Sequence, residues 1–327
     1  MSRNLHAMIL AAVAASGAMD IGARADDSPL LKRFLEEYPE AMKRLESRYG
    51  RSSGSVRFMS FSTPEPRNPR IKPPTEANHD EEFISHRPEM ARVTVRLPIS
   101  KLYDELVTCY NSRYEFRLLK PKEKPNYVIN LVDFKKKPDL PEVEGRYLWR
   151  YLNAPYCLLF LPVGRLMSHP DRTIKDATRV EVGGKECLKV SFVLPRAVSG
   201  KDTSGGHEGW FMVSPQERWV VREYQLRPLQ GKVIWTGKIE YEGLSEGFPV
   251  PRKITHRSAL IANPAESSTE TYDFREFRFI DAPDDVFTLS NFGLPEPTAP
   301  DSSPNAAPVV PAKDATPPSG DVKKPHP

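Results

Sequence analysis

The sequence predicts a mainly β (α+β) fold: a curved antiparallel sheet or half-open β-barrel, with an N-terminal helix and short capping helices. Two observations predict it. Through the second half of the chain, apolar and polar residues alternate in segments that recur about every 10–15 residues, which is typical of an antiparallel meander and not of βαβ units. One early segment instead repeats apolar residues at three- and four-residue steps, the period of an amphipathic helix.

Length and charge set broad limits on the function. The 327 residues are enough to bury a substantial core in one β domain. The 47 Lys and Arg nearly balance the 43 Asp and Glu, which leaves a net charge of +4. Net charge alone therefore does not indicate a nucleic-acid or anionic membrane partner, and we expect no nucleic acid and no cofactor.

The N-terminus has the features of an export signal. Arg3 supplies a positive charge, residues 5–19 are apolar, and Ala23-Arg24-Ala25 places small residues where a signal peptidase reads them. The apolar run is shorter than the ~20 residues of a spanning helix, so a membrane anchor is the less favoured alternative. We expect a signal peptide at 1–25 that is cleaved near Ala25, and a periplasmic or secreted chain without a transmembrane segment.

A single β domain is predicted over 26–294, and it opens with the amphipathic helix at 28–49. Ser28 fits the N-cap, Pro29 fits the first helical position, Pro39 is expected to kink or split the helix, and Gly50 ends it. Further elements of the first half are strands at 54–61, 92–99, 114–118 and 127–134, a proline-rich loop at 63–78, and short helical turns at 147–152 and 162–168.

Two consecutive hairpins at 179–195 and 209–228 begin the second half. Gly183-Gly184 supplies the positive φ of a tight turn in the first hairpin, and Ser214–Glu217 is turn-like in the second. Strands at 232–241, 252–261 and 269–280 complete a meander of about seven strands. From residue 295 onward, prolines without aromatic residues predict a disordered tail.

Large apolar side chains on these strands are the candidate binding residues. Either they line a concave apolar cavity or they simply pack a solid core, and the sequence leaves both open. The residues we expect on the concave face are Trp210, Met212, Tyr224, Leu226 and Trp235.

The motifs that carry chemistry elsewhere do not predict a catalytic or metal site here. Gly50–Gly54 matches G-x-S-x-G, but a helix precedes it and a strand follows it, the reverse of a nucleophile elbow, so Ser52 is not predicted to be catalytic. The carboxylate pairs at 81–82 and 284–285 lie in loop-like sequence. The histidines lack metal-ligand spacing, and they are His79, His86, His169, His207 and His256.

The cysteines and the clustered lysines each allow two structural interpretations. Cys109, Cys157 and Cys187 allow one disulfide with a thiol left over, or three buried free thiols. Lysines at 120, 122, 124 and 135–137 make a basic edge, which we interpret as protection against sheet aggregation in preference to an anionic-ligand site.

The order of motifs resembles a known family. A helix passes directly into a strand, and V-x-V-G-G-x-E-C-L-K-V-x-F at 180–192 is followed by the hairpin G-W-F-M-V-S-P-x-x-x-W-V-V-R-E-Y at 209–224, G-K-I-E-Y at 237–241 and P-V-P-R-K-I at 249–254. This is similar to the LolA/LolB-like superfamily of periplasmic lipoprotein carriers, which includes RseB-type sensor domains. The ending at 285–297 also resembles exported proteins of planctomycete-type bacteria.

The resemblance covers about 29–61 and 178–295. It implies a half-open barrel with helices across its mouth and an apolar interior that holds acyl chains. The turn at Ser214-Pro215 lacks the acidic residue usual at that tip in the family, and the proline-rich loop and the tail are not part of the pattern. No ligand-binding residue of the family is therefore carried over to this chain.

These observations together predict an exported, non-enzymatic protein that binds a lipid, a lipoprotein or another apolar ligand in the cell envelope. The alternative is a structural or interaction protein with a packed sheet, whose tail contacts an envelope protein partner.

Overall fold

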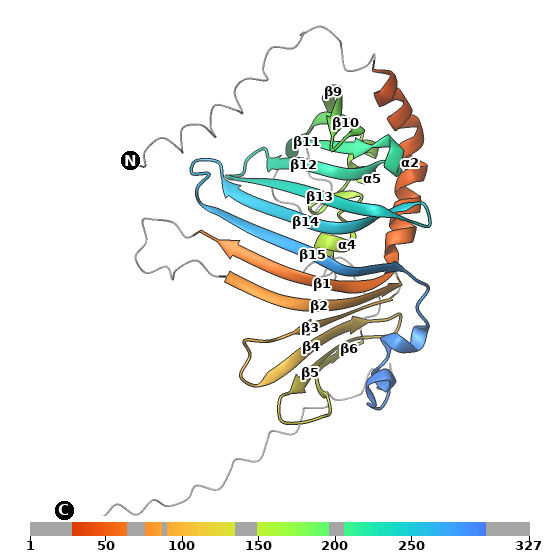
Figure 1. Cartoon of the computed structure of the whole chain (residues 1–327), viewed down its shortest axis with the longest axis vertical. Coiled ribbons are helices and arrows are strands. Elements are labelled where there is room, and N and C mark those ends of the chain that lie inside the picture. The colour runs from red at the N-terminus through yellow and green to blue at the C-terminus, as the bar shows by residue number, and fades with distance from the viewer. Residues whose placement is uncertain (1–27, 64–75, 87–89, 135–148, 196–205, 299–327) are drawn as a thin grey trace, which may run out of the picture.

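A computed structural model describes residues 28–63, 76–86, 90–134, 149–195 and 206–298. They form a 13-stranded antiparallel sheet with one long helix across one face (Figure 1). The expected signal peptide, most of the proline-rich loop, the lysines at 135–137 and residues 299–327 lie outside the described residues. The elements are α2 (Pro29–Gly50), β1 (Arg51–Ser62), β2 (Glu76–His86), β3 (Met90–Arg96), β4 (Tyr103–Tyr110), β5 (Glu115–Pro121), β6 (Val128–Asp133), α4 (Trp149–Leu152), β7 (Cys157–Leu158), β8 (Leu161–Pro162), α5 (Val163–Ser168), β9 (Thr173–Val182), β10 (Lys185–Leu194), β11 (His207–Ser214), η2 (Pro215–Glu217), β12 (Val220–Pro228), β13 (Val233–Ser245), β14 (Phe248–Leu260), β15 (Ser267–Phe279), η3 (Asp284–Phe287) and η4 (Leu289–Phe292).

The sheet consists of two meanders, β1–β6 and β9–β15, which join where β1 pairs with β15. Strands β6 and β9 form its two edges, so the sheet stays open. The predicted fold class, a curved antiparallel sheet with an N-terminal helix and short capping helices, is confirmed, as is the seven-strand meander of the second half. The pair Glu81-Glu82 lies in β2 and not in a loop, because backbone pairing with β1 and β3 forms this strand despite its polar sequence.

Helix α2 runs unbroken from Pro29 to Gly50, so the expected split at Pro39 is wrong. Ser28 caps it as predicted, with its Oγ accepting a hydrogen bond from the Leu31 amide at 3.4 Å. Pro39 removes one intrahelical hydrogen bond. The apolar stripe of the helix continues past this point, and its burial against the sheet stabilises both halves. The buried residues of the stripe are Leu31, Phe34, Tyr38, Met42, Leu45 and Tyr49.

We define the inner face of the sheet as the face on which α2, α4 and α5 pack, and the outer face as the opposite one. At one end of the inner face, the ring of Phe34 lies 6.0 Å from that of Phe211 and 5.1 Å from that of Trp219. Nearer the middle, the ring of Tyr151 on α4 packs 5.2 Å from that of Tyr272. The helices therefore fill much of the inner face with apolar side chains.

All three cysteines are buried free thiols, which decides between the two readings of the sequence. Burial raises the pKa of the Cys109 thiol far above its ordinary value. Ser52 is also fully buried, and its hydroxyl donates to the Tyr49 carbonyl at 2.8 Å. The three cysteines and Ser52 are therefore packed inside the protein as parts of its core.

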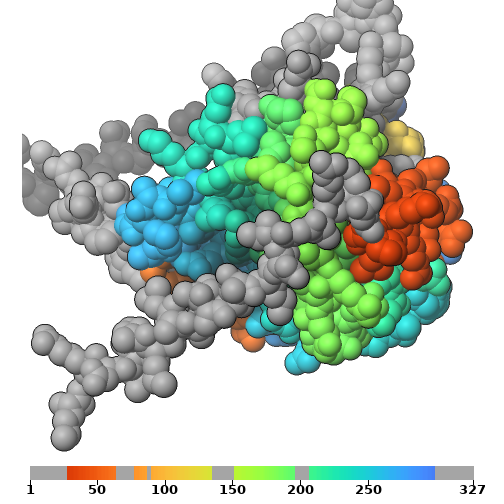
Figure 2. Space-filling model, turned by 90° about the horizontal axis from the view of Figure 1, so that it is seen from above, coloured from red at the N-terminus to blue at the C-terminus, as the bar shows by residue number. Residues whose placement is uncertain are grey.

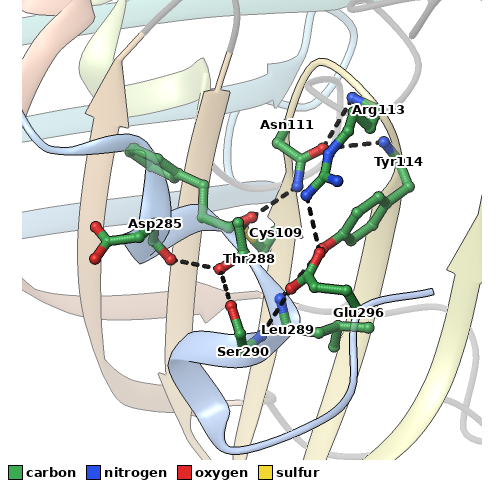
Figure 3. Close-up of polar contacts among 10 residues, drawn as sticks. Cys109, Asn111, Arg113, Tyr114, Asp285, Thr288, Leu289, Ser290 and Glu296 are labelled. Atoms are coloured by element: carbon green, nitrogen blue, oxygen red, sulfur yellow. Dashed lines mark hydrogen bonds and ion pairs between the residues drawn. The ribbon is translucent and has the colours of Figure 1, made fainter. Parts of the chain in front are cut away.

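The segment after β15 folds back over the outer face of β3–β5. Phe287 and Leu289 are fully buried there against Cys109, Phe116 and their neighbours, which form a second apolar core. The Asn111 side chain fixes the segment by donating from Nδ2 to the Phe287 carbonyl at 2.8 Å (Figure 3). The two faces of the sheet thus carry separate cores.

Glu296 closes this segment. Its carboxylate accepts hydrogen bonds from the Tyr114 hydroxyl at 2.5 Å, from Arg113 at 2.9 Å and from the Ser290 amide at 2.9 Å (Figure 3). Partial burial alone would raise the pKa of Glu296, but these hydrogen bonds and the charge of Arg113 outweigh it and hold the pKa below its ordinary value. Glu296 lies within the predicted tail, so the described structure extends past residue 295.

Replacing Glu296 with Gln should lower the free energy of unfolding at pH 7 by about 1–2 kcal/mol, the usual size of hydrogen bonds to a charged group. Because the folded pKa lies below the ordinary value, this contribution is present above the ordinary carboxyl pKa and disappears as pH falls through the folded value. Urea unfolding should therefore show a larger difference between the two proteins at pH 7 than near pH 3. An equal difference at both values would contradict this role of the charge.

Candidate ligand-binding site on the inner face

Strand register places two rows of side chains across the inner face of β11–β15. The first row comprises Phe211, Tyr224, Gly237, His256 and Glu270. The second comprises Gly209, Leu226, Trp235, Ser258 and Ser268. Both rows change from apolar on β11 and β12 to polar on β14 and β15. The inner face thus carries an apolar half beside a polar half.

Tyr224 connects the two halves. Its hydroxyl lies 2.9 Å from Nδ1 of His256, across the intervening strand β13. The ring can cross β13 only because residue 237 is glycine, since a Cβ there would lie 2.1 Å from Cε1 of Tyr224. On the polar side, the Tyr272 hydroxyl donates to Oε2 of Glu270 at 3.3 Å. The polar half is therefore a fixed network of phenol, imidazole and carboxylate groups.

A small recess of about 140 Å³ lies beside this network. Its lining residues are Leu159, Trp235, Thr236, His256, Arg257, Ser258, Ser268 and Glu270. Hydroxyl, imidazole and carboxylate groups thus line the recess together with one indole ring and one leucine. Its volume is below the roughly 300–1,000 Å³ of typical small-molecule pockets, so it fits a small group or one end of a larger ligand.

The β7–β8 hairpin borders the recess. Leu159 at its tip has a φ of 60°, which is strained for a bulky residue. Phe160 follows and is 55% exposed, although its ring packs 5.7 Å from that of Trp235 and 5.6 Å from that of His207. Seen from above, the green segment that carries this hairpin lies between α2 and the cyan and blue strands (Figure 2). The strained turn therefore presents an exposed aromatic ring beside the recess.

The structure divides the five residues predicted for the concave face. Tyr224, Leu226 and Trp235 share the inner face, since Leu226 pairs with Trp235 and Tyr224 pairs with Phe211. Trp210 and Met212 alternate with Phe211 and lie on the outer face, where Lys189 lies over the Trp210 ring at 4.6 Å. The prediction for these two was wrong because the hairpin register, with its bulge after Met212, decides which residues share a face.

Tyr224 and Leu226 are fully buried, whereas Trp235 borders the recess. The sequence reading did not include Leu159, Phe160, His256 and Glu270. Leu159 and Phe160 lie in an apolar run of the sequence that is typical of a buried core segment. Only the positive φ of Leu159, which the sequence does not reveal, distinguishes the turn from such a segment. His256 and Glu270 belong to different strands, and only the register brings them together. Among the described residues, no three His, Cys, Asp or Glu side chains are placed to share a metal ion.

Comparison with known proteins gives likenesses of structure only. No protein-family model and no curated protein matches the sequence. A LolA superfamily protein from Nitrosomonas europaea is similar with a TM-score of 0.41 at 13% identity, over 83% of this chain and 100% of that chain. An outer membrane lipoprotein-sorting protein domain from Vibrio parahaemolyticus gives 0.41 at 9% identity, over 80% and 98%. A DUF1329 family protein from Desulfovibrio piger gives 0.40 at 12% identity, over 80% and 98%.

The LolA-like resemblance predicted from the motifs thus has counterparts among solved structures. At these TM-scores the likeness carries no inference about ligands, and the planctomycete origin stays a prediction. In the described part of the chain, no helix has the length and apolar character needed to cross a membrane.

Proposed function

We propose that this chain is an exported, non-enzymatic protein that binds an amphiphilic ligand, such as a lipid or an acylated protein segment, at the inner-face recess. The observation that supports this most directly is the half-exposed Phe160 ring, which a strained turn holds beside the recess, packed against Trp235. Export is supported by the apolar N-terminal segment and its Ala-Arg-Ala site.

An amphiphile suits the recess better than a purely apolar ligand. Leu159, Phe160 and Trp235 offer apolar contact at the mouth, while His256 and Glu270 offer hydrogen-bonding groups inside. A ligand without polar groups would displace water from the polar groups of the recess and return no hydrogen bonds, which costs free energy. Because the recess holds only about 140 Å³, the polar end would enter it and the apolar chain would lie along Phe160 and Trp235.

Replacing Phe160 with Ala should weaken binding of a dansyl-labelled fatty acid about tenfold, because burial of a phenyl ring contributes about 1.5–3 kcal/mol. Fluorescence titration measures the dissociation constant. Phe61 is the matched control, since it is 48% exposed on β1 but, unlike Phe160, has no ring contact with Trp235, so Phe61→Ala should leave the affinity unchanged. Mass spectrometry of protein purified from its own envelope should also detect a bound lipid. Failure of the unmodified protein to bind the probe, together with a lipid-free preparation, would refute the proposal.

The second candidate is a structural or interaction protein with a solidly packed sheet. The complete burial of Tyr224 and Leu226 favours it, because the apolar half of the inner face is filled by the protein itself. In that case residues 299–327 would contact the envelope partner, and their deletion would abolish that contact without affecting stability.

A further inference from the structure

Two turns at the same end of the sheet expose apolar side chains together. The β3–β4 turn contains Ile99, which is 79% exposed, and Leu102, which is 68% exposed. The β5–β6 turn lies next to it, since the Lys122 amide donates to the Leu102 carbonyl at 3.0 Å. Both turns lie at the strand ends away from α2 (Figure 1). We use the name apolar tip for Ile99 and Leu102 together with Lys101, Lys122 and Lys124, the lysines of the two turns.

Hydrogen bonds hold the β3–β4 turn in this conformation. Ser100 donates its amide to the Leu97 carbonyl at 3.1 Å. Its Oγ accepts hydrogen bonds from the amides of Leu102 at 3.3 Å and Tyr103 at 3.0 Å. These hydrogen bonds hold the turn in a conformation that exposes Ile99 and Leu102 to solvent. The backbone of the turn therefore loses little conformational entropy when the two side chains are buried in an apolar environment.

Lysines surround the exposed pair. Lys101, Lys122 and Lys124 are exposed, and among the described residues they have no carboxylate partner within ion-pair distance. The carboxylates of the two turns and their flanks are Asp104, Glu105 and Glu123, of which Glu105 is engaged by Lys120 at 3.6 Å and by the Tyr127 hydroxyl. Beside the turns is an open cavity of about 490 Å³. Its lining is Arg57, Asn78, His79, Asp80, Arg96, Leu97, Pro98, Asp104, Glu105, Lys120 and Lys122.

Another exposed leucine gives an informative contrast. Leu244 is 63% exposed in the β13–β14 hairpin, at the opposite strand ends beside α2. Its charged neighbours in sequence are Glu242 and Glu246. Ile99 and Leu102 are thus exposed among lysines, whereas Leu244 is exposed between carboxylates. Only the first arrangement combines apolar insertion with attraction to phosphate groups.

We propose that the apolar tip docks the protein on the surface of an anionic lipid bilayer. Ile99 and Leu102 enter the boundary between headgroups and acyl chains, while Lys101, Lys122 and Lys124 contact lipid phosphates. The 490 Å³ cavity beside the turns is lined by both cations and carboxylates, so the lysines of the turns and not the cavity supply the attraction to lipid phosphates. Each lysine at the surface contributes about fivefold to membrane partitioning.

Co-sedimentation with vesicles tests this docking. The full chain should bind phosphatidylglycerol-containing vesicles more tightly than pure phosphatidylcholine vesicles, and 0.5 M salt should reduce the difference. Ile99→Ser with Leu102→Ser should weaken binding about tenfold. Lys101→Gln with Lys122→Gln and Lys124→Gln should abolish most of the preference for anionic lipid. Leu244→Ser should change nothing.

Circular dichroism of each variant checks that it is folded, and all these positions are exposed. Equal binding by the native chain and by both tip variants would overturn the proposal. So would a loss of equal size on Leu244→Ser, or binding independent of lipid charge and salt. Retained vesicle binding with lost fatty-acid binding in Phe160→Ala would separate this docking from the proposed ligand site.

Discussion

Replacing Phe34 with Ala should lower the free energy of unfolding by about 3–5 kcal/mol, the usual cost of emptying a buried phenylalanine site. Phe34 is fully buried where α2 meets the sheet, and its ring contacts those of Tyr38, Phe211 and Trp219 at 5.1–6.0 Å. The β-strands around the space left by the Phe34 ring are held by pairing with strands on both sides, so they cannot move in to fill it. Urea denaturation at pH 7 measures the difference.

Phe61→Ala is the control for this substitution, because Phe61 is 48% exposed on β1. Removing its ring should change the free energy of unfolding by less than about 1 kcal/mol. If both variants lost the same stability, α2 would not be held by the contacts of Phe34.

Replacing Gly237 with Ala should lower the free energy of unfolding by about 2–4 kcal/mol. The new Cβ would lie 2.1 Å from Cε1 and 2.7 Å from the hydroxyl of Tyr224, which is fully buried and cannot turn into solvent. The ring must shift, and its hydrogen bond to His256 is lost with it. Overpacking and an unsatisfied buried hydroxyl each cost about 1–3 kcal/mol.

The matched control is Gly164→Ala in α5, where the new Cβ meets Met42 at an ordinary 3.7 Å. Alanine is the better helix former, so this variant should be neutral or up to about 1 kcal/mol more stable. Urea denaturation of both variants separates the steric effect at Gly237 from the general effect of adding a methyl group. A stable Gly237→Ala protein would show that Tyr224 has another position available.

Alternation and turn residues predicted most of the meander because each is a local property. The Gly183-Gly184 turn forms as expected, and both glycines have positive φ. Strands β2 and β4 were both missed. The sequence of β2 is polar and lacks alternation, and its pairing with β1 and β3 is non-local. Of the five residues predicted for the site, Trp235 borders the recess, whereas Phe160, His256 and Glu270 come from segments that the sequence does not relate.

The sequence by itself determined a capped amphipathic helix, the antiparallel meander of the second half of the chain and an apolar N-terminal segment. Only the tertiary structure decided which side chains share a face, because a shift of one residue or a bulge reverses every side chain of a strand. It also decided that helix packing fills most of the inner face and leaves a small polar-lined recess. Neither property is local, since both depend on strands and helices that are far apart in the chain.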